Sequence, residues 1–422
     1  MKVLGIVVEY NPFHNGHLYH LKKAKEKVEP DFTVAVMSGD FTQRGEPTIV
    51  DKYARAEIAL SLGVDVVLEL PFVYATQDAG GFAFGSVGTL HKSGIVTDIV
   101  FGSESSDEEF LKTVAQILHE QPWRYQEILH VKLKQGLSFP NARKEALIEY
   151  VKEKNILSVD RVRNIEKSND ILGVEYARSI LRYNSKIRFH TIKRVGAQYN
   201  EEDFKGKLSS ATAIRKMIRE GNFELVKEAL PEESSEILTR EFRSGRGPVF
   251  WHDLDRLFLY KFRVMERDDF KDIYGFVEGL DKRFYEYSRR ARSSQEFIEM
   301  VKAKRFTYSR LRRMMLYVLF GVTKSLMNDV NKYGPQYIRV LGFTKKGRKL
   351  LSLMKKKASV PIITTPSTYR KFLQDKNYDI NPDLYRKMFL YDIKASDVYA
   401  TLYPKRDNRK GNVDFRRKVI IV

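Results

Sequence analysis

The stretch VLGIVVEYNPFHNGHLYHLKKAKEKV, residues 3–28, decides the fold. It begins with the apolar run VLGIVV (3–8), which is typical of a buried strand in a parallel sheet. It ends with HLYHLKKAKEKV (17–28), which has the spacing of a helix. The polar turn between the two runs carries His14, and the second run begins with His17 and has a third histidine at position 20. A strand, a polar turn and a helix in this order predict the first unit of an α/β sheet.

The same alternation continues to about residue 220. Apolar runs at 32–37, 65–70, 97–102 and 187–195 predict further strands, and 51–63 and 85–94 predict helices that finish on a glycine. This order predicts an α/β fold with a Rossmann-like, doubly wound parallel sheet. Such sheets bind ligands beyond the carboxyl ends of their strands, where His14 and His17 fall.

Charge divides the chain into two parts. The net charge is +20, and residues 231–422 hold nearly all of it, with 42 basic and 23 acidic residues. We place a domain boundary in 229–250, which contains two prolines and two glycines. The prediction is an α/β domain over 1–228, with a helical insertion near 106–155, and a basic, mostly helical domain over 229–422. A charge excess confined to one part indicates a module that binds a polyanion.

Composition excludes several classes of chemistry. The sequence has no cysteine, which rules out disulfides, thiolate zinc sites and cysteine nucleophiles. The first apolar run is too short to span a membrane, and Glu9 closes it. We therefore expect a cytoplasmic protein with no membrane partner.

The histidines at 14, 17 and 20 have three interpretations. His14 and His17 lack the i, i+4 spacing of helical zinc sites, and Glu9 is the only carboxylate on the turn, so no metal site is predicted. Packing in the core is one remaining interpretation. Phosphate binding is the other, because Gly16 lets backbone approach a ligand, and a helix N-terminus and imidazole N–H groups suit an anion. The residues alone leave both open for His14 and His17, and His20 is expected to be structural.

Two motifs resemble those of the nucleotidylyltransferase superfamily, whose members bind ATP. HNGH (14–17) resembles its H-x-G-H signature, and LSSATAIRKMI (208–218) resembles a later motif that contacts the β- and γ-phosphates. On this resemblance Ser209, Ser210, Thr212 and Arg215 face the phosphates. The plain alternative for the second motif is an ordinary N-capped helix.

A closer resemblance covers most of residues 1–220. Six stretches resemble the bacterial tRNA(Met) cytidine acetate ligase family: GIVVEYNPFHNGHLYHL, SGDFTQRGEP, DKYARAEIAL, ELPF, FGSES and SNDILGVEY. Members of that family activate acetate with ATP and transfer the acetyl group to N4 of the wobble cytidine of elongator tRNA(Met). The resemblance implies a nucleotidylyltransferase-type α/β fold and the same ligase activity here, with ATP, acetate and elongator tRNA(Met) as partners.

The resemblance also assigns site residues. His14 and His17 would be catalytic, stabilising the α-phosphate transition state, while Ser210, Thr212 and Arg215 would hold the leaving pyrophosphate. Mg²⁺ is expected to bridge phosphates. The full ATP-binding set would be Ile6, Val7, Val8, Glu9, Tyr10, Asn11, Pro12, Phe13, His14, Asn15, Gly16, His17, Leu18, Tyr19, Gly102, Asn169, Arg194, Ser210, Thr212 and Arg215. Taken singly, Gly102 could be a turn glycine, Asn169 a helix cap and Arg194 a surface charge.

The loop SGDFTQRGEP (38–47) follows the second predicted strand. Asp40, Gln43 and Arg44 are candidates to close over an acyl-adenylate or to admit the tRNA base. An ordinary surface loop is the alternative.

Residues 301–370 carry 17 lysines and arginines against a single acid, Asp329, with aromatic residues interleaved. This density favours a phosphate backbone, and aromatic rings can stack on RNA bases. Aromatics in the core and lysines on a solvated face are the alternative, but they do not explain one acid among eighteen charges. The predicted tRNA-binding residues are Lys302, Lys304, Arg305, Arg310, Arg312, Arg313, Lys345 and Lys346.

Three functional hypotheses follow. The first is the ATP-dependent tRNA cytidine acetate ligase. The second is another nucleotidylyltransferase that adenylylates a small phosphorylated metabolite, although such an enzyme needs no polyanion platform. The third is a non-catalytic RNA-binding protein, against which the intact His14, Gly16, His17 and Arg215 argue.

Overall fold

The computed structural model describes residues 1–158, 161–162, 167–194, 206–277, 279–303, 306–375 and 377–422. Its centre is one eight-stranded sheet in the order β5-β4-β1-β2-β3-β6-β7, with β8 paired to β6. The strands are β1 (Val3–Val8), β2 (Phe32–Ser38), β3 (Val66–Leu70), β4 (Asp98–Ser103), β5 (Arg188–Lys193), β6 (Ile338–Phe343), β7 (Ile362–Ile363) and β8 (Ile420–Ile421). The five strands predicted from the sequence are β1 to β5, and their bounds agree with the prediction within about two residues.

The first five strands are parallel, which confirms the doubly wound sheet. The chain runs from β1 to β2 and β3 in one direction, then returns to add β4 and β5 on the other side of β1. The order therefore reverses between β1 and β4, and this switch point opens a crevice at the carboxyl ends of these two strands. Helices α1 (Asn15–Val28) and α2 (Lys52–Ser61) make the first two crossovers.

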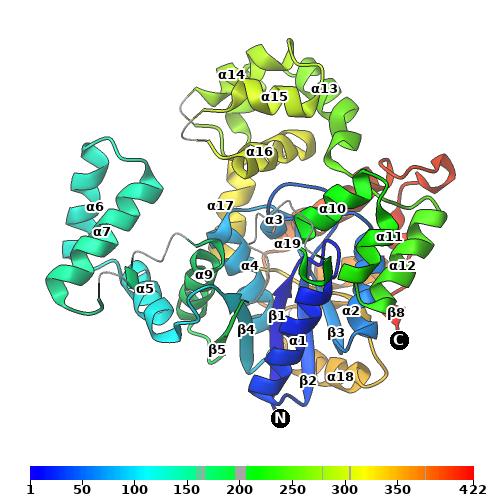
Figure 1. Ribbon diagram of the computed structural model, residues 1–422, viewed down its shortest axis with the longest axis horizontal. Coiled ribbons are helices and arrows are strands. Elements are labelled where there is room, and N and C mark those ends of the chain that lie inside the picture. The colour runs from blue at the N-terminus through cyan, green and yellow to red at the C-terminus, as the bar shows by residue number, and fades with distance from the viewer. Residues whose placement is uncertain (159–160, 163–166, 195–205, 278, 304–305, 376) are drawn as a thin grey trace.

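Helices α3 (Phe72–Ala75) and α4 (Ala79–Lys92) lead from β3 to β4. Helix α4 begins six residues before the predicted start at 85, because the Asp78 side chain caps it by accepting the Gly81 N–H. The stretch expected to be a helical insertion contains α5 (Glu108–Glu120), α6 (Trp123–Lys134) and α7 (Phe139–Lys154), and α9 (Ser168–Arg182) returns the chain to β5. The α6–α7 hairpin stands away from the sheet (Figure 1).

The C-terminal part is mainly helical, but it also completes the sheet. Strand β6 pairs antiparallel with β3, and β7 and β8 pair parallel with β6. That the chain divides after residue 228 into two folding units stays a prediction. The sheet contains strands from both sides of this position. The remaining helices are α10 (Ala211–Arg219), α11 (Phe223–Val226), α12 (Glu232–Arg243), α13 (Asp255–Val264), α14 (Leu280–Ser288), α15 (Ser294–Val301), α16 (Tyr308–Phe320), α17 (Lys324–Tyr333), α18 (Gly347–Lys357), α19 (Pro382–Ala400) and α20 (Val413–Arg416).

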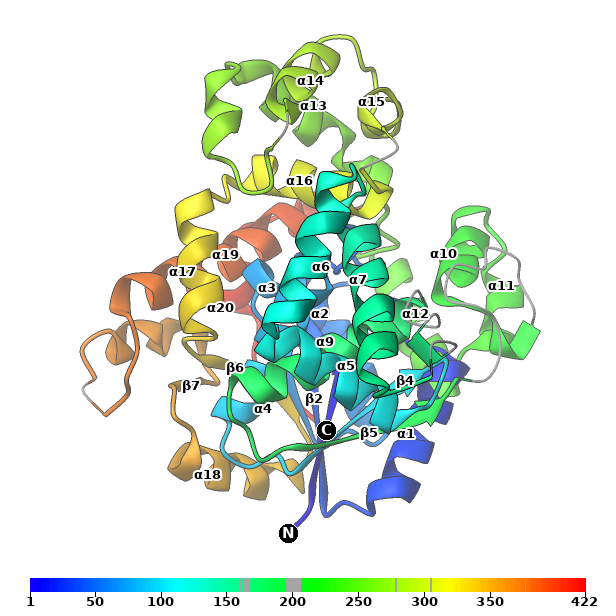
Figure 2. The ribbon, with the colours of Figure 1, turned by 90° about the vertical axis from the view of Figure 1, so that its left-hand side faces the viewer.

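The helices of the C-terminal part lie on opposite sides of the molecule. Helices α13 to α16 form its top in Figures 1 and 2, whereas α18 lies at the bottom. Among the described residues, no helix combines the length and the apolar character that crossing a bilayer requires.

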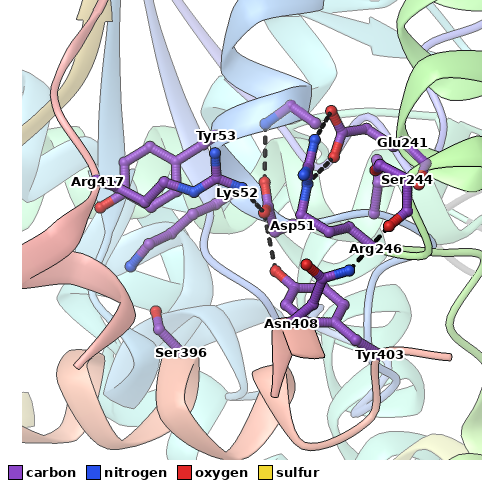
Figure 3. Close-up of polar contacts among 12 residues, drawn as sticks. Asp51, Lys52, Tyr53, Glu241, Ser244, Arg246, Ser396, Tyr403, Asn408 and Arg417 are labelled. Atoms are coloured by element: carbon purple, nitrogen blue, oxygen red, sulfur yellow. Dashed lines mark hydrogen bonds and ion pairs between the residues drawn. The ribbon is translucent and has the colours of Figure 1, made fainter. Parts of the chain in front are cut away.

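Polar contacts tie the last residues of the chain to α2 (Figure 3). Asp51 caps α2 and also accepts hydrogen bonds from the Tyr403 hydroxyl (2.9 Å) and from Arg417 (3.1 Å). Arg246, which follows α12, donates to Glu241 on that helix. The C-terminal segment is therefore fastened to the fold by these contacts rather than appended as a free tail.

Candidate active site

A cavity of about 430 Å³ opens at the switch point between β1 and β4. This volume is within the usual range for small-molecule sites. Its walls come from the loop after β1, the loop after β2, the end of β4, the start of α9, the end of β5 and the segment that leads into α10. Segments separated by up to two hundred residues thus meet where a doubly wound sheet binds its ligand.

His14 caps helix α1 on the cavity wall. Its Nδ1 accepts the Gly16 backbone N–H at 3.1 Å, so the neutral ring carries its proton on Nε2. This cap is the reason why α1 begins at Asn15 instead of at the predicted residue 17. Burial, together with the nearby charges of Arg194 and Arg215, lowers the pKa of His14 to about 3. The imidazole is therefore neutral near pH 7 and offers an N–H donor.

His17 stacks on His14, with 3.8 Å between the ring centroids, and also lines the cavity. Its Nδ1 accepts the His14 backbone N–H at 3.3 Å, which again leaves the proton on Nε2. Burial and the neighbouring His14 lower the pKa of His17 well below its ordinary value. Two neutral imidazoles therefore meet at the N-terminus of α1, where the helix dipole favours an anion.

The expectation that His20 is structural stays a prediction. This residue lines the same cavity, and its Nε2 atom is buried without a hydrogen-bond partner among the described residues. Burial, with Arg194 nearby, lowers its pKa to about 4. A buried polar atom without a partner is uncommon, and the position of His20 on the cavity wall makes it a candidate for contact with a ligand.

The predicted ATP-binding loop divides between wall and core. Val7, Val8, Glu9, Tyr10, Asn11, His14, Gly16, His17 and Tyr19 line the cavity. Ile6, Pro12 and Phe13 are instead buried in the core, and Leu18 packs against it. The Asn15 amide donates to the carbonyls of Lys207 and Glu228, which fastens the loop to the chain around α10.

Gly102 and Arg194 lie together at the cavity's β4–β5 edge. A side chain at Gly102 would place Cβ only 3.2 Å from Arg194 Cγ, so the arginine lies across the bare backbone. Asn169 lines the neighbouring wall and donates its amide to Glu104 at 2.6 Å. The structure therefore brings these three predicted residues to one side of the cavity.

The second predicted motif lies on the other side. Ser209, Ser210, Thr212 and Arg215 all line the cavity, and Ser210 caps α10 by accepting the Ala213 N–H at 3.1 Å. The capped-helix interpretation and the cavity position are therefore compatible. Arg215 donates to the Asn11 carbonyl at 2.8 Å and pairs with Glu46 at 3.3 Å.

The loop between β2 and α2 closes a further wall. Thr42, Gln43, Arg44 and Glu46 face the cavity, so two of the loop's three predicted candidates lie there. The third, Asp40, is buried outside the wall, where it accepts hydrogen bonds from the Lys52 N–H and the Ser396 hydroxyl. Glu9 accepts the Gln43 N–H at 2.7 Å, and burial raises its pKa despite this bond and the charge of Arg44.

An apolar wall was missed in the sequence. It comprises Ala79, Phe82, Phe101, Ile171, Leu172 and Tyr176. These residues belong to α4, β4 and α9, where they follow the same pattern as core residues. No local signal separates an apolar residue that faces a cavity from one that packs in the core.

The predicted tRNA-binding residues do not form one surface. Arg312 pairs with Glu46, and Arg313 donates to the Gln43 carbonyl at 3.0 Å, so both contact the cavity loop. Lys302 and Arg310 lie nearby, over the rings of Tyr308 and Phe306. Lys345 and Lys346 are exposed at the opposite edge of the sheet, beside α18, while Lys304 and Arg305 fall outside the described residues.

The chain matches the family described as HIGH nucleotidyl transferase over residues 1–414. It is 54% identical over 428 residues to the tRNA(Met) cytidine acetate ligase of Thermosipho africanus, covering 100% of both chains. It is 56% identical over 408 residues to that of Thermotoga maritima, covering 97% of each. The chain belongs to the tRNA(Met) cytidine acetate ligase family.

Solved structures of a family member agree with this assignment. The crystal structure of apo Thermotoga maritima TmcAL matches with a TM-score of 0.98 at 56% identity and covers 100% of both chains. The same enzyme bound with alpha-thio ATP matches with a TM-score of 0.96 at 55% identity, over 100% of this chain and 99% of that one.

Proposed function

We propose that this chain is an ATP-dependent ligase that activates acetate as acetyl-adenylate and acetylates N4 of the wobble cytidine of elongator tRNA(Met). The observation that carries the proposal is the meeting of His14, His17 and Arg215 in one cavity at the switch point. Relatives that share half or more of the sequence over its full length bear the name of that ligase, and one of them was solved with an ATP analogue.

The first step joins acetate to AMP. A carboxylate oxygen of acetate attacks the α-phosphorus of ATP, and pyrophosphate leaves. The neutral His14 and His17 rings donate Nε2–H groups to oxygens on which charge grows. Ser210, Thr212 and Arg215 hold the pyrophosphate from the α10 side.

The nucleoside half of ATP lies on the opposite side. Gly102 lets backbone approach the ligand, Arg194 lies across it, and Asn169 supplies amide groups. The apolar wall around Phe82, Phe101 and Tyr176 covers rings and keeps water from the adenylate.

Mg²⁺ fits this site as a companion of the nucleotide. Among the described residues, no three histidine or carboxylate side chains are grouped to hold a metal ion. Magnesium is commonly held by substrate phosphates with one or two carboxylates, and the cavity wall supplies Glu9. When bound, the ion would neutralise phosphate charge.

In the second step the N4 amine of the cytidine attacks the acetyl carbonyl, and AMP leaves. The substrate is already activated, so positioning and exclusion of water contribute more than a strong base. We assign the docking of tRNA to the basic part, residues 229–422. The contacts of Arg312 and Arg313 with the cavity loop bring helix α16, which also carries Arg310, against the cavity wall.

Incubation with ATP, acetate and unmodified elongator tRNA(Met), followed by mass analysis of the nucleosides, tests the proposal. An acetyl increment on cytidine that depends on both ATP and acetate is the expected result. Acetate-dependent exchange of pyrophosphate into ATP without acetylated RNA would retain the first step and refute the acceptor. No exchange and no acetylation would refute the ligase function.

A further inference from the structure

Arg312 on α16 is mostly buried and already paired, unlike an arginine on an exposed RNA-binding surface. Its guanidinium pairs with the Glu46 carboxylate, and its side chain is only 22% exposed. It also lies over the Trp251 ring, 5.4 Å from the centroid, and its Nε atom is buried without a partner among the described residues. The charge of Arg312 is therefore directed at one carboxylate in the cavity loop.

Glu46 is shared between two arginines. One oxygen, Oε1, pairs with Arg312, and the other, Oε2, pairs with Arg215 at 3.3 Å. Arg215 has a second contact, with the Asn11 carbonyl at 2.8 Å. A continuous row of charges, Arg312–Glu46–Arg215, thus runs from α16 through the cavity loop to the phosphate side of the cavity.

The charge balance of this row determines what Arg215 can do. With both arginines present, the row has a net charge of +1, so Arg215 keeps attraction for an anion. Without Arg312, Arg215 would be the one remaining ion-pair partner of Glu46 among the described residues, and the net charge of the row would be zero. The carboxylate would then compete directly with phosphate oxygens for the Arg215 guanidinium.

The loop is seated too closely on α16 for this contact to be accidental. Gly45 has a φ of +78°, and a Cβ there would lie 2.6 Å from the backbone nitrogen of Arg313. Arg313 itself donates to the Gln43 carbonyl at 3.0 Å. The backbone of the loop is therefore held against α16 in the residues just before Glu46.

We propose that Arg312 is a positioning residue of the ATP site, which neutralises Glu46 and so leaves Arg215 available to the β- and γ-phosphates. The inference rests on the proposed function for the identity of the ligand. It changes the role of Arg312 from a contact with tRNA to a contact that acts on the nucleotide.

The test measures the affinity for ATP and for pyrophosphate by calorimetry, without tRNA, and the KM values in acetate-dependent pyrophosphate exchange. Arg312→Gln is expected to weaken the affinities for ATP and pyrophosphate five- to tenfold and to raise the KM values for these two ligands by the same factor. The KM for acetate is expected to change less than twofold. Adding Glu46→Gln to this variant removes the competing carboxylate and is expected to restore the affinities to within about twofold of the original. Arg312→Lys keeps the positive charge and is expected to lose less affinity for ATP and pyrophosphate than Arg312→Gln.

Lys324→Gln, at an exposed position at the start of the neighbouring helix α17, is the matched control and is expected to leave nucleotide binding unchanged. Unchanged affinities in Arg312→Gln would overturn the inference, as would a double variant no better than the single one, which would indicate a structural role. A protein that binds neither ATP nor pyrophosphate before any substitution would instead refute the proposed function. Unfolding curves for each variant separate loss of affinity from loss of folded protein.

Discussion

Lys52 and Asp414 form a completely buried ion pair, 3.1 Å between Nζ and Oδ2, although 362 residues separate them in the sequence. Glu69 on β3 and Arg339 on β6 complete the cluster, at 2.7 Å from Lys52 and 2.7 Å from Asp414 respectively. The two cations hold the pKa of Asp414 near 2, although burial opposes this. Each charge depends on the others, because removing one leaves its partners buried and unbalanced.

Asp414→Asn is accordingly expected to destabilise the protein by about 3–5 kcal/mol. Urea unfolding measures this loss as a lower midpoint. Glu57→Gln is the matched control, since it breaks the more exposed pair with Arg240 and should cost less than about 1 kcal/mol. Equal losses in the two variants would contradict the role assigned to the buried cluster.

His17→Ala is expected to reduce acetate-dependent pyrophosphate exchange by about a hundredfold or more, since a donor to the transition state is removed from a water-poor site. tRNA affinity should change less than threefold, because the contacts of His17 within the described part of the chain are with Tyr10, Phe13 and His14, which all lie in the loop after β1. Filter binding with tRNA measures the second quantity. His119→Ala, at an exposed position on α5, serves as the control. If pyrophosphate exchange and tRNA affinity were both lost to the same extent, the result would instead indicate misfolding.

His20 is expected to make the free energy of unfolding depend on pH in a defined direction. Its pKa is about 4 in the folded protein, below its ordinary value of 6.5, so between these values only the unfolded chain takes up the proton. Stability from this group is therefore present above pH 6.5 and is lost as the pH falls towards 4. His20→Gln should flatten the slope of unfolding free energy against pH by up to about 1.4 kcal/mol per pH unit. An unchanged slope would mean that His20 titrates normally.

Gly173 on α9 supports the apolar wall. A Cβ there would lie 2.4 Å from Phe101 Cε2, so Gly173→Ala must displace a ring that lines the cavity. We expect a loss of about 1–3 kcal/mol in stability and weaker ATP binding. Gly80→Ala, in α4, meets nothing closer than 3.5 Å and should be neutral or slightly stabilising. Thermal unfolding and calorimetry with ATP compare the two variants.

The features that could be predicted from the sequence are those that a local pattern of residues determines. Strands β1 to β5 follow from apolar runs between turn residues, and the cavity position of His14 and Gly16 follows from strand order, whereas Arg215 was assigned from the family resemblance. The run IRVLGF, which forms β6, was not recognised, because only its antiparallel pairing with β3 makes it a strand of this sheet. Arg312 was assigned to RNA because composition counts charges but does not reveal their partners. Its contact with Glu46 joins residues 266 positions apart.

The late arrival of β6 has a consequence for synthesis of the protein on the ribosome. Strand β3 is complete at residue 70, but the strand that covers its outer edge ends at residue 343. The nascent chain therefore carries an apolar strand with one uncovered edge through most of its elongation, and such edges invite pairing with other chains. A product released before codon 338 would contain every residue that lines the cavity and still lack a closed sheet. The residues of the nucleotide site are therefore all synthesised well before the sheet that supports them is complete.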